Sequence, residues 1–200
     1  MRRVADDTRT RILDLAVAAI DAGGEASLRL DPILAAAGVT APTLYHHFGS
    51  REGLVVAAQI ERYTRQNKAD IASLRRALSQ IDSAEEFRVA LRATWNVMLG
   101  RRAENRWRKI NIVGSAYGRP ELEAAVAEAQ DEIVAAFVEL FEPARRKGWI
   151  RTDVDLVTTV AWQIALQTGR VFLEHGQRQG DPAVWDALTL DALERTIFEP

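Results

Sequence analysis

Residues 33–53 constrain the fold of this 200-residue chain more than any other stretch. They read ILAAAGVTAPTLYHHFGSREG, which places a short helical segment on either side of a glycine. The alanines at 35–37 are small enough for two helices to cross closely, and Gly38 can end the first helix in a tight turn. Thr40 is a good N-cap for the second helix, and Pro42 falls in its first turn, where a missing N–H is tolerated. This layout predicts a helix-turn-helix, whose second helix enters the major groove of DNA.

The end of this stretch makes the prediction more specific. Tyr45-His46-His47-Phe48 is followed by Gly49-Ser50-Arg51-Glu52-Gly53-Leu54, in which the serine can cap a further helix. The pattern closely resembles the DNA-binding signature of the TetR family of transcriptional regulators, in which G-V-S/T, L-Y-x-H/Y-F and S-K/R-E-x-L recur in this order. The resemblance implies an all-α chain with a three-helix DNA-binding domain at residues 1–50. It also implies a helical domain for effector binding and dimerisation at residues 51–200.

Two positions depart from the family pattern. Arg29 stands where Ser or Thr usually caps the second helix, so Asp31-Pro32 is expected to open that helix instead. Leu34 stands where a small alanine is usual, and its larger side chain is expected to shift the crossing of the two helices.

Apolar residues recur at helical spacing along the rest of the chain. Phe87, Leu91, Trp95 and Met98, for example, follow one another at intervals of four, four and three residues. A long helix is expected from residue 50 to about residue 68, joining the two domains. No alternation typical of a strand is present, so the pattern agrees with an all-α fold.

Eight residues are candidates for contacts with DNA, because they lie in or beside the expected recognition helix: Thr40, Ala41, Pro42, Thr43, Tyr45, His46, His47 and Arg51. Ala41, Pro42 and Thr43 are expected on its first turn, where recognition helices meet base edges. Thr43 can hydrogen-bond a base or touch a thymine methyl, whereas the other two offer apolar contact only. No arginine or asparagine of this surface can read a base pair in bidentate fashion, so specificity is expected to depend on DNA shape.

The remaining candidates are expected at the DNA backbone. Thr40 can bind a phosphate, because a helix N-terminus favours an anion. The resemblance assigns Tyr45 and His47 to phosphates, and Arg51 to a phosphate contact in place of the commoner lysine. His46 can reach either bases or backbone.

The last third of the chain differs in character. Residues 156–166 are apolar nearly all round, and residues 185–197 form an amphipathic helix. The resemblance implies that these two helices build a four-helix interface in a homodimer. The alternative is that the same residues fill the core of one monomer.

A ligand pocket inside the C-terminal domain is also implied by the resemblance. Small-molecule sites in helical bundles combine an apolar wall with a few polar anchors. Residues that offer both are Trp95, Trp107, Asn111, Tyr117, Phe137, Trp162, Gln163 and Gln167. The alternative is that each of these aromatic side chains only packs in the core. The five cations within residues 101–109 are by default a solvated helix face, with an anionic effector as the other possibility.

Several function classes lack support in the sequence. The chain has no cysteine, and the adjacent His46 and His47 point about 100° apart on a helix, so no metal and no cofactor are expected. No phosphate loop, nucleophile elbow or HExxH motif is present, so an enzyme is not expected. The first residues lack the apolar segment of a signal peptide, and no apolar run approaches about 18 residues, so a cytoplasmic protein without a membrane partner is expected. The net charge of −2 does not by itself indicate nucleic-acid binding, so that prediction depends on the motif.

The sequence therefore predicts a DNA-binding transcriptional regulator. A repressor that a small-molecule effector releases from a pseudo-palindromic operator is the favoured form. The first alternative is a DNA-binding regulator that is controlled by a protein partner or acts as an activator, without a small-molecule pocket. The second is a helical enzyme or carrier with a vestigial helix-turn-helix.

Overall fold

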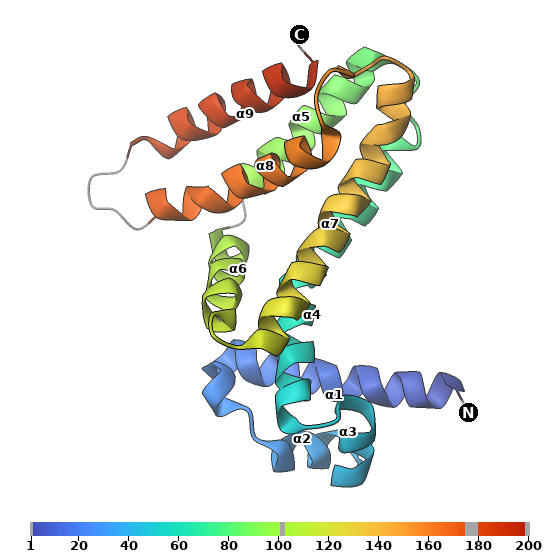
Figure 1. Ribbon diagram of the computed structural model, residues 1–200, viewed down its shortest axis with the longest axis vertical. Helices are drawn as coiled ribbons and strands as arrows, with labels where there is room; N and C mark the ends of the chain where they lie inside the picture. The colour runs from blue at the N-terminus through green and yellow to red at the C-terminus, as the bar shows by residue number, and fades with distance from the viewer. Residues whose placement is uncertain (1, 101–102, 175–179, 199–200) are drawn as a thin grey trace.

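The computed structural model describes residues 2–100, 103–174 and 180–198 (Figure 1). Within these ranges the chain is all-α, as the sequence predicts, with two short 3-10 helices and no strand. The α-helices are α1 (Arg2–Gly23), α2 (Leu30–Ala37), α3 (Ala41–Phe48), α4 (Arg51–Leu78), α5 (Ala84–Gly100), α6 (Ala103–Ala116), α7 (Pro120–Arg146), α8 (Leu156–Gly169) and α9 (Pro182–Phe198). The 3-10 helices are η1 (Glu25–Ser27) and η2 (Arg170–Leu173). None of the helices so described is long and apolar enough to cross a membrane.

The first three α-helices and the start of α4 surround a small core of their own, at the bottom of the molecule in Figure 1. Ile12 and Ile20 of α1 meet Leu28, Leu44 and Leu54, and each of these side chains is at most 2% exposed. Burying such side chains stabilises the folded state by about 1.5–3 kcal/mol each. This core holds α2 and α3 against α1, so the position of the helix-turn-helix is set by packing.

Helix α4 leaves this unit and runs beside α7 to the far end of the molecule (Figure 1). Ser50 caps it as predicted, because its hydroxyl accepts a hydrogen bond from the N–H of Gly53 at 2.9 Å. The helix continues to Leu78, ten residues beyond the expected end near Lys68. The polar run does not stop it, because the amide of Asn67 is buried and hydrogen-bonded to the carbonyl of Tyr63 within the helix.

A second and larger core lies between the remaining helices. Phe87, Leu91 and Trp95 of α5 are buried against Phe137 of α7 and Leu193 of α9, which agrees with the helical spacing seen in the sequence. Helix α4 borders both cores, so it connects the N-terminal unit to the rest of the chain. We propose that the two units are separate domains, and the division expected at residues 50/51 falls at the start of this connecting helix.

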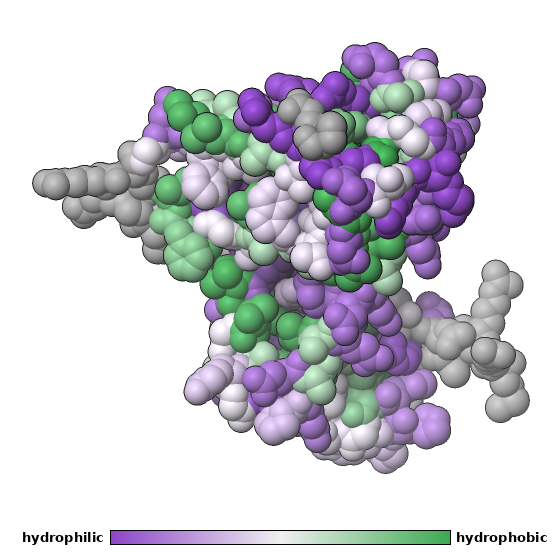
Figure 2. Space-filling view, turned by 45° about the horizontal axis from the view of Figure 1, so that its top comes forward, coloured by the Kyte–Doolittle hydropathy of each residue, from purple (hydrophilic) through white to green (hydrophobic). Residues whose placement is uncertain are grey.

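Helices α8 and α9 lie together on one side of the C-terminal unit (Figure 1). Their inner sides are buried, as Val160 and Leu193 show. Their outer sides carry large apolar side chains that remain 37–65% exposed in a single chain: Val157, Trp162, Val184 and Leu188. Hydrophobic surface gathers on this side of the molecule, at the left of Figure 2. The single chain therefore buries only part of the apolar surface of these two helices.

Candidate nucleic-acid interface and interior cavities

The turn between α2 and α3 has the geometry of a helix-turn-helix. Gly38 ends α2 in the left-handed region, with φ 63° and ψ 38°, a conformation that favours glycine. The N–H of Val39 then donates to the carbonyl of Leu34 at 3.1 Å, which closes the turn. Helix α2 begins at Leu30 with Arg29 as its N-cap residue, so Asp31 lies inside the helix, and the sequence expectation that Asp31-Pro32 would open it is wrong by one residue. The backbone N–H and C=O groups at a helix end lack hydrogen-bond partners within the helix. Tertiary packing can therefore shift the end by a residue or two.

Helix α3 is fixed through one face and leaves the other free. Leu44 is fully buried and Phe48 is 9% exposed, so both side chains hold the helix on the core. Thr40 is the N-cap residue, and its hydroxyl hydrogen-bonds the hydroxyl of Thr43 at 3.2 Å. Tyr45 is 45% exposed, and His46 is exposed beside it.

The other candidates lie close to this exposed face. Pro42 is exposed in the first turn, and Ala41 and His47 are half-buried. Arg51, in the first turn of α4, is exposed, and its Nη2 donates to the carbonyl of Leu28 at 3.1 Å. Its backbone partner orients the guanidinium without neutralising its charge. Arg9 of α1 adds a second cation, 5.2 Å from the ring centre of Phe48. All eight sequence candidates thus share one region of the surface.

The structure gives a role to Gly53, a residue of the motif to which the sequence analysis assigned none. A Cβ at this position would collide with the carbonyl of Phe48, so α4 starts in direct contact with the end of α3. Only glycine permits this approach. The contact couples the position of α3 to the direction of α4.

The corner between α6 and α7 touches the N-terminal unit through charged side chains. Nη1 of Arg119 lies 3.0 Å from Oε2 of Glu25, and its Nη2 bonds Glu52 at the start of α4. Gln59 donates to the same carboxylate of Glu25 at 3.0 Å. Burial raises the pKa of Glu25, but the hydrogen bonds from Arg119 and Gln59 outweigh it and lower that pKa below 4.5. The sequence showed Arg119 only as the residue before a helix-starting proline, because nothing local reveals a partner 94 positions away.

The candidate ligand residues separate into two groups. Trp95, Phe137, Gln163 and Gln167 line one internal cavity of about 20 Å³ between α5, α7 and α8. Phe137 and Gln167 also line a neighbouring polar cavity of about 30 Å³, together with Arg106. Both volumes are sufficient for about one water molecule each.

The other four candidates do not line these cavities. Tyr117 is 88% exposed at the end of α6, and Asn111 is exposed on the same helix. Trp162 points to the outer side of α8, and Trp107 is half-buried. These four residues lie at helical spacing from the other candidates in the sequence. In the structure, however, their side chains do not point into the two cavities.

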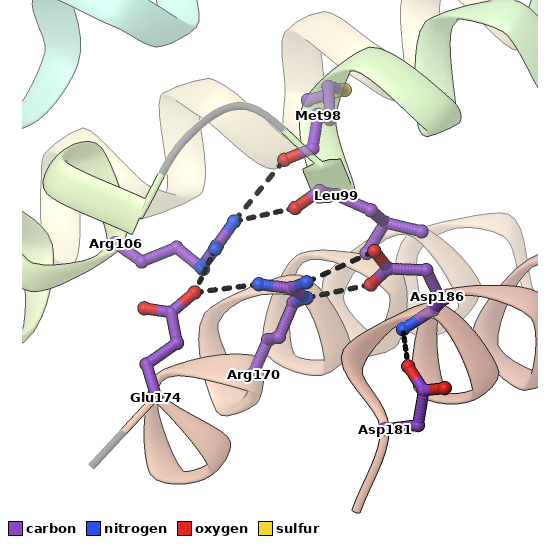
Figure 3. A network of polar contacts seen from close by, with 8 residues as sticks. Met98, Leu99, Arg106, Arg170, Glu174, Asp181 and Asp186 are labelled. Carbon is purple, nitrogen blue, oxygen red and sulfur yellow. Dashed lines mark hydrogen bonds and ion pairs between the residues drawn. The ribbon is translucent and has the colours of Figure 1, made fainter.

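A buried ion network joins α6, η2 and α9 (Figure 3). Arg170 makes two hydrogen bonds to Asp186, at 2.7 and 3.0 Å, and a third to Glu174 at 2.8 Å. Arg106 bonds the same carboxylate and donates to the carbonyl of Leu99 at 3.0 Å. The bonds to Asp186 and Glu174 raise the pKa of Arg170. Sequence reasoning missed this network, because its members lie up to 80 residues apart.

The cation run at residues 101–109 is largely engaged within the chain. Arg101 and Arg102 lie outside the described residues. Arg108 pairs with Glu104 at 3.1 Å, and Nζ of Lys109 donates to Asn67 at 2.8 Å. Arg106 belongs to the buried network above. An open anion site is therefore not formed by the three described cations.

No group of three metal-ligating side chains occurs in the part of the chain that the structure describes. The rings of His46 and His47 meet edge to face, 5.4 Å apart between centroids. Asp155 caps α8, and its carboxylate accepts a hydrogen bond from the N–H of Thr158 at 2.7 Å.

A three-helix unit that presents the exposed face of its third helix, on a long connecting helix, defines a helix-turn-helix DNA-binding protein. Comparison with known proteins agrees with this class. Residues 12–58 match the family profile described as "Bacterial regulatory proteins, tetR family". The regulator UidR of Escherichia coli (strain K12) is 24% identical over 159 residues, covering 80% of this chain and 77% of its own length.

Solved structures show the same fold. A TetR-family chain from Mesorhizobium loti MAFF303099 superposes with a TM-score of 0.70 at 19% identity, covering 97% of this chain and 98% of its own. FadR of Thermus thermophilus, a TetR-family repressor in complex with lauroyl-CoA, has a TM-score of 0.66 at 17% identity, covering 94% of both chains. This chain belongs to the TetR family and is a DNA-binding transcriptional regulator. Regulators of this family act as dimers, are generally not enzymes, and in some cases bind small-molecule ligands.

Proposed function

We propose that this protein is a homodimeric repressor that leaves a pseudo-palindromic operator when a small-molecule effector binds its C-terminal domain. The exposed face of α3, held from behind by Leu44 and Phe48, is the observation that carries this proposal. Thr43 and Tyr45 lie on or beside that face, where a base edge and a phosphate are within reach of a docked helix.

The outer sides of α8 and α9 support the homodimer. Trp162 and Leu188 keep 37% and 65% of their surface exposed in a single chain. Contiguous apolar surface of this kind marks an interaction site. A two-fold interface here would place two copies of α3 side by side, and entry into successive major grooves requires a spacing of about 34 Å.

A route from the C-terminal domain to α3 supports control by an effector. Helix α4 borders both cores, and Arg119 bonds Glu25 and Glu52 of the N-terminal unit. A ligand that favours a different position of the α6–α7 corner would change the spacing of the recognition helices. By linkage, the operator then weakens effector binding by the same factor, with a coupling of about 1–3 kcal/mol on the usual scale.

The small interior cavities favour a second candidate function. The two cavities that the candidate ligand residues line, of about 30 and 20 Å³, leave little room for a ligand at those residues. A regulator that responds to a protein partner, or that activates transcription, needs no such room. Transcription from the selected operator with purified RNA polymerase separates the two candidates: a repressor lowers the transcript level, and a small-molecule effector restores it.

The first experiment is selection of genomic DNA fragments by the purified protein at controlled salt. The wild type is compared with a Thr43→Ala/Tyr45→Ala variant, in which the core residues of α3 are unchanged. Enrichment of one palindromic site by the wild type, lost in the variant, supports the proposal. Equal and weak binding of all fragments by both proteins contradicts it.

A further inference from the structure

A surface groove adjoins the two interior cavities and shares several lining side chains with them. The groove, of about 320 Å³, lies between α4 and α5 and is lined largely by small residues such as Ala77, Ala90 and Ala93. Met98 lines the groove and both cavities. Leu74 and Thr94 complete the wall between the groove and the apolar cavity. The groove therefore shares four lining side chains with the two cavities, Asp70, Leu74, Thr94 and Met98, and the last of these is an unbranched and flexible methionine.

Two buried N–H donors line the interior without a partner. Gln163 is 4% exposed, and its Nε2 has no hydrogen-bond partner among the described atoms. Arg106 is 5% exposed, and its Nε is likewise without one. A buried donor without an acceptor is costly, because it has lost its bonds to water. The polar cavity also holds a buried acceptor without a partner, Oδ1 of Asn105. In the apolar cavity the described atom without a partner is the donor of Gln163, so that cavity offers a hydrogen bond to a molecule that brings an acceptor.

The charges around the interior are balanced. Glu174 accepts from Arg106 and from Arg170, and Arg170 is paired in turn with Asp186. The polar cavity is lined by two cations, Arg106 and Lys109, and by the carboxylate of Asp70, and Arg106 is already paired with Glu174. A charged ligand would enter without a counter-ion, and a buried unpaired charge is unfavourable. An uncharged acceptor fits this environment better.

We infer that the effector is a compact, uncharged molecule with an apolar body and one acceptor oxygen, such as a ketone or an amide. Its body occupies the groove between α4 and α5 and displaces Met98, and its oxygen accepts a hydrogen bond from Nε2 of Gln163. The inference rests on the effector-controlled function proposed above. It names the chemical class of the ligand and the passage by which it enters.

A matched set of probes tests the class of ligand. The probes are 4-phenylbutan-2-one, the isosteric anion 3-phenylpropanoate and the hydrocarbon n-propylbenzene, titrated calorimetrically into the full-length protein. We expect the ketone to bind with a Kd of about 1 mM or below and the anion to bind at least about tenfold more weakly. Tighter binding of the anion, or no binding of the ketone, overturns the inference.

Variants test the site. Gln163→Leu removes the donor and keeps an apolar side chain, so we expect the ketone to bind about three- to tenfold more weakly and n-propylbenzene to bind no more weakly. Gln163→Met is a second variant in case the first does not fold, and the exposed Gln80→Leu is the matched control. Met98→Ala widens the passage and is expected to strengthen ketone binding. Ketone affinity that is the same in all four variants and the wild type overturns the inference.

Operator binding is measured separately from ligand binding. A ketone that binds through Gln163 without releasing the operator contradicts the effector function but supports the site. An operator that is never selected contradicts the proposed function, whatever the titrations show.

Discussion

Nη1 of Arg119, at the corner between α6 and α7, lies 3.0 Å from Oε2 of Glu25 in the N-terminal unit. Its Nη2 bonds Glu52 in the first turn of α4, so one guanidinium joins this corner to both η1 and α4. These bonds must stretch or break if the corner moves relative to the recognition helix. Arg119 therefore links the position of this corner to that of the DNA-binding unit.

The energy of this contact can be measured with a double-mutant cycle of Arg119→Gln and Glu25→Gln. Both side chains are about 30% exposed, so we expect a coupling energy of about 0.5–1 kcal/mol in urea unfolding. The exposed pair Glu142 and Arg146 on α7, 4.0 Å apart, is the matched control and is expected to give less. A coupling no larger than that of the control would show that the contact does not stabilise the fold.

The stability contributed by Glu25 should depend on pH. Its pKa is lowered below 4.5 in the folded state, so its contribution is complete above about pH 4.5 and is lost as pH falls through the folded value. The difference in Tm between the wild type and Glu25→Gln should therefore be constant near neutral pH and shrink in acid. The exposed Glu132→Gln variant is the control, with a small difference at every pH. A difference between wild type and Glu25→Gln that grows as pH falls would contradict the expected sign.

Substitution by alanine should change the stability of the protein in opposite directions at two glycines. Gly38 has φ 63°, so Gly38→Ala is expected to destabilise the protein by about 1–2 kcal/mol and to weaken operator binding by distorting the helix-turn-helix. Gly114 lies within α6, where an added Cβ meets open space, so Gly114→Ala is expected to stabilise by about 0.5–1 kcal/mol. Thermal and urea unfolding measure both changes. Equal effects of the two substitutions would show that the turn tolerates a side chain.

The homodimer should depend on the outer side of α9. Leu188 is 65% exposed, so Leu188→Arg should leave the fold of the single chain intact while placing a charge in the proposed interface. We expect sedimentation to shift from dimer to monomer. Val113→Arg changes an exposed apolar residue of α6, 48% exposed, and should leave the dimer unchanged. A Leu188→Arg protein that stays dimeric would place the interface elsewhere.

Local sequence was sufficient for the elements that depend on local chemistry. A left-handed turn favours a residue without Cβ, so Gly38 marked the end of α2. A helix start favours a side chain that accepts a hydrogen bond, so Ser50 marked the start of α4. Helical spacing placed Phe87, Leu91 and Trp95 on one face of a helix, because residues three and four apart share a face, and that face is buried. The end of α4 was underestimated, since Asn67 is polar in the sequence but buried and paired in the fold.

Tertiary structure alone decided which distant residues meet. The contacts of Arg106 with Glu174 and of Arg119 with Glu25 join positions 68 and 94 residues apart, and no local pattern encodes such pairs. The same holds for the candidate ligand residues: Gln163 turns inward and Trp162 outward, although they are neighbours in the chain. Which face of a helix is covered depends on the helices packed against it. The sequence by itself therefore determined the all-α class, the helix ends at Gly38 and Ser50 and the DNA-binding motif. Packing decided the cavities, the exposed face of α8 and α9, and the contact between the two units.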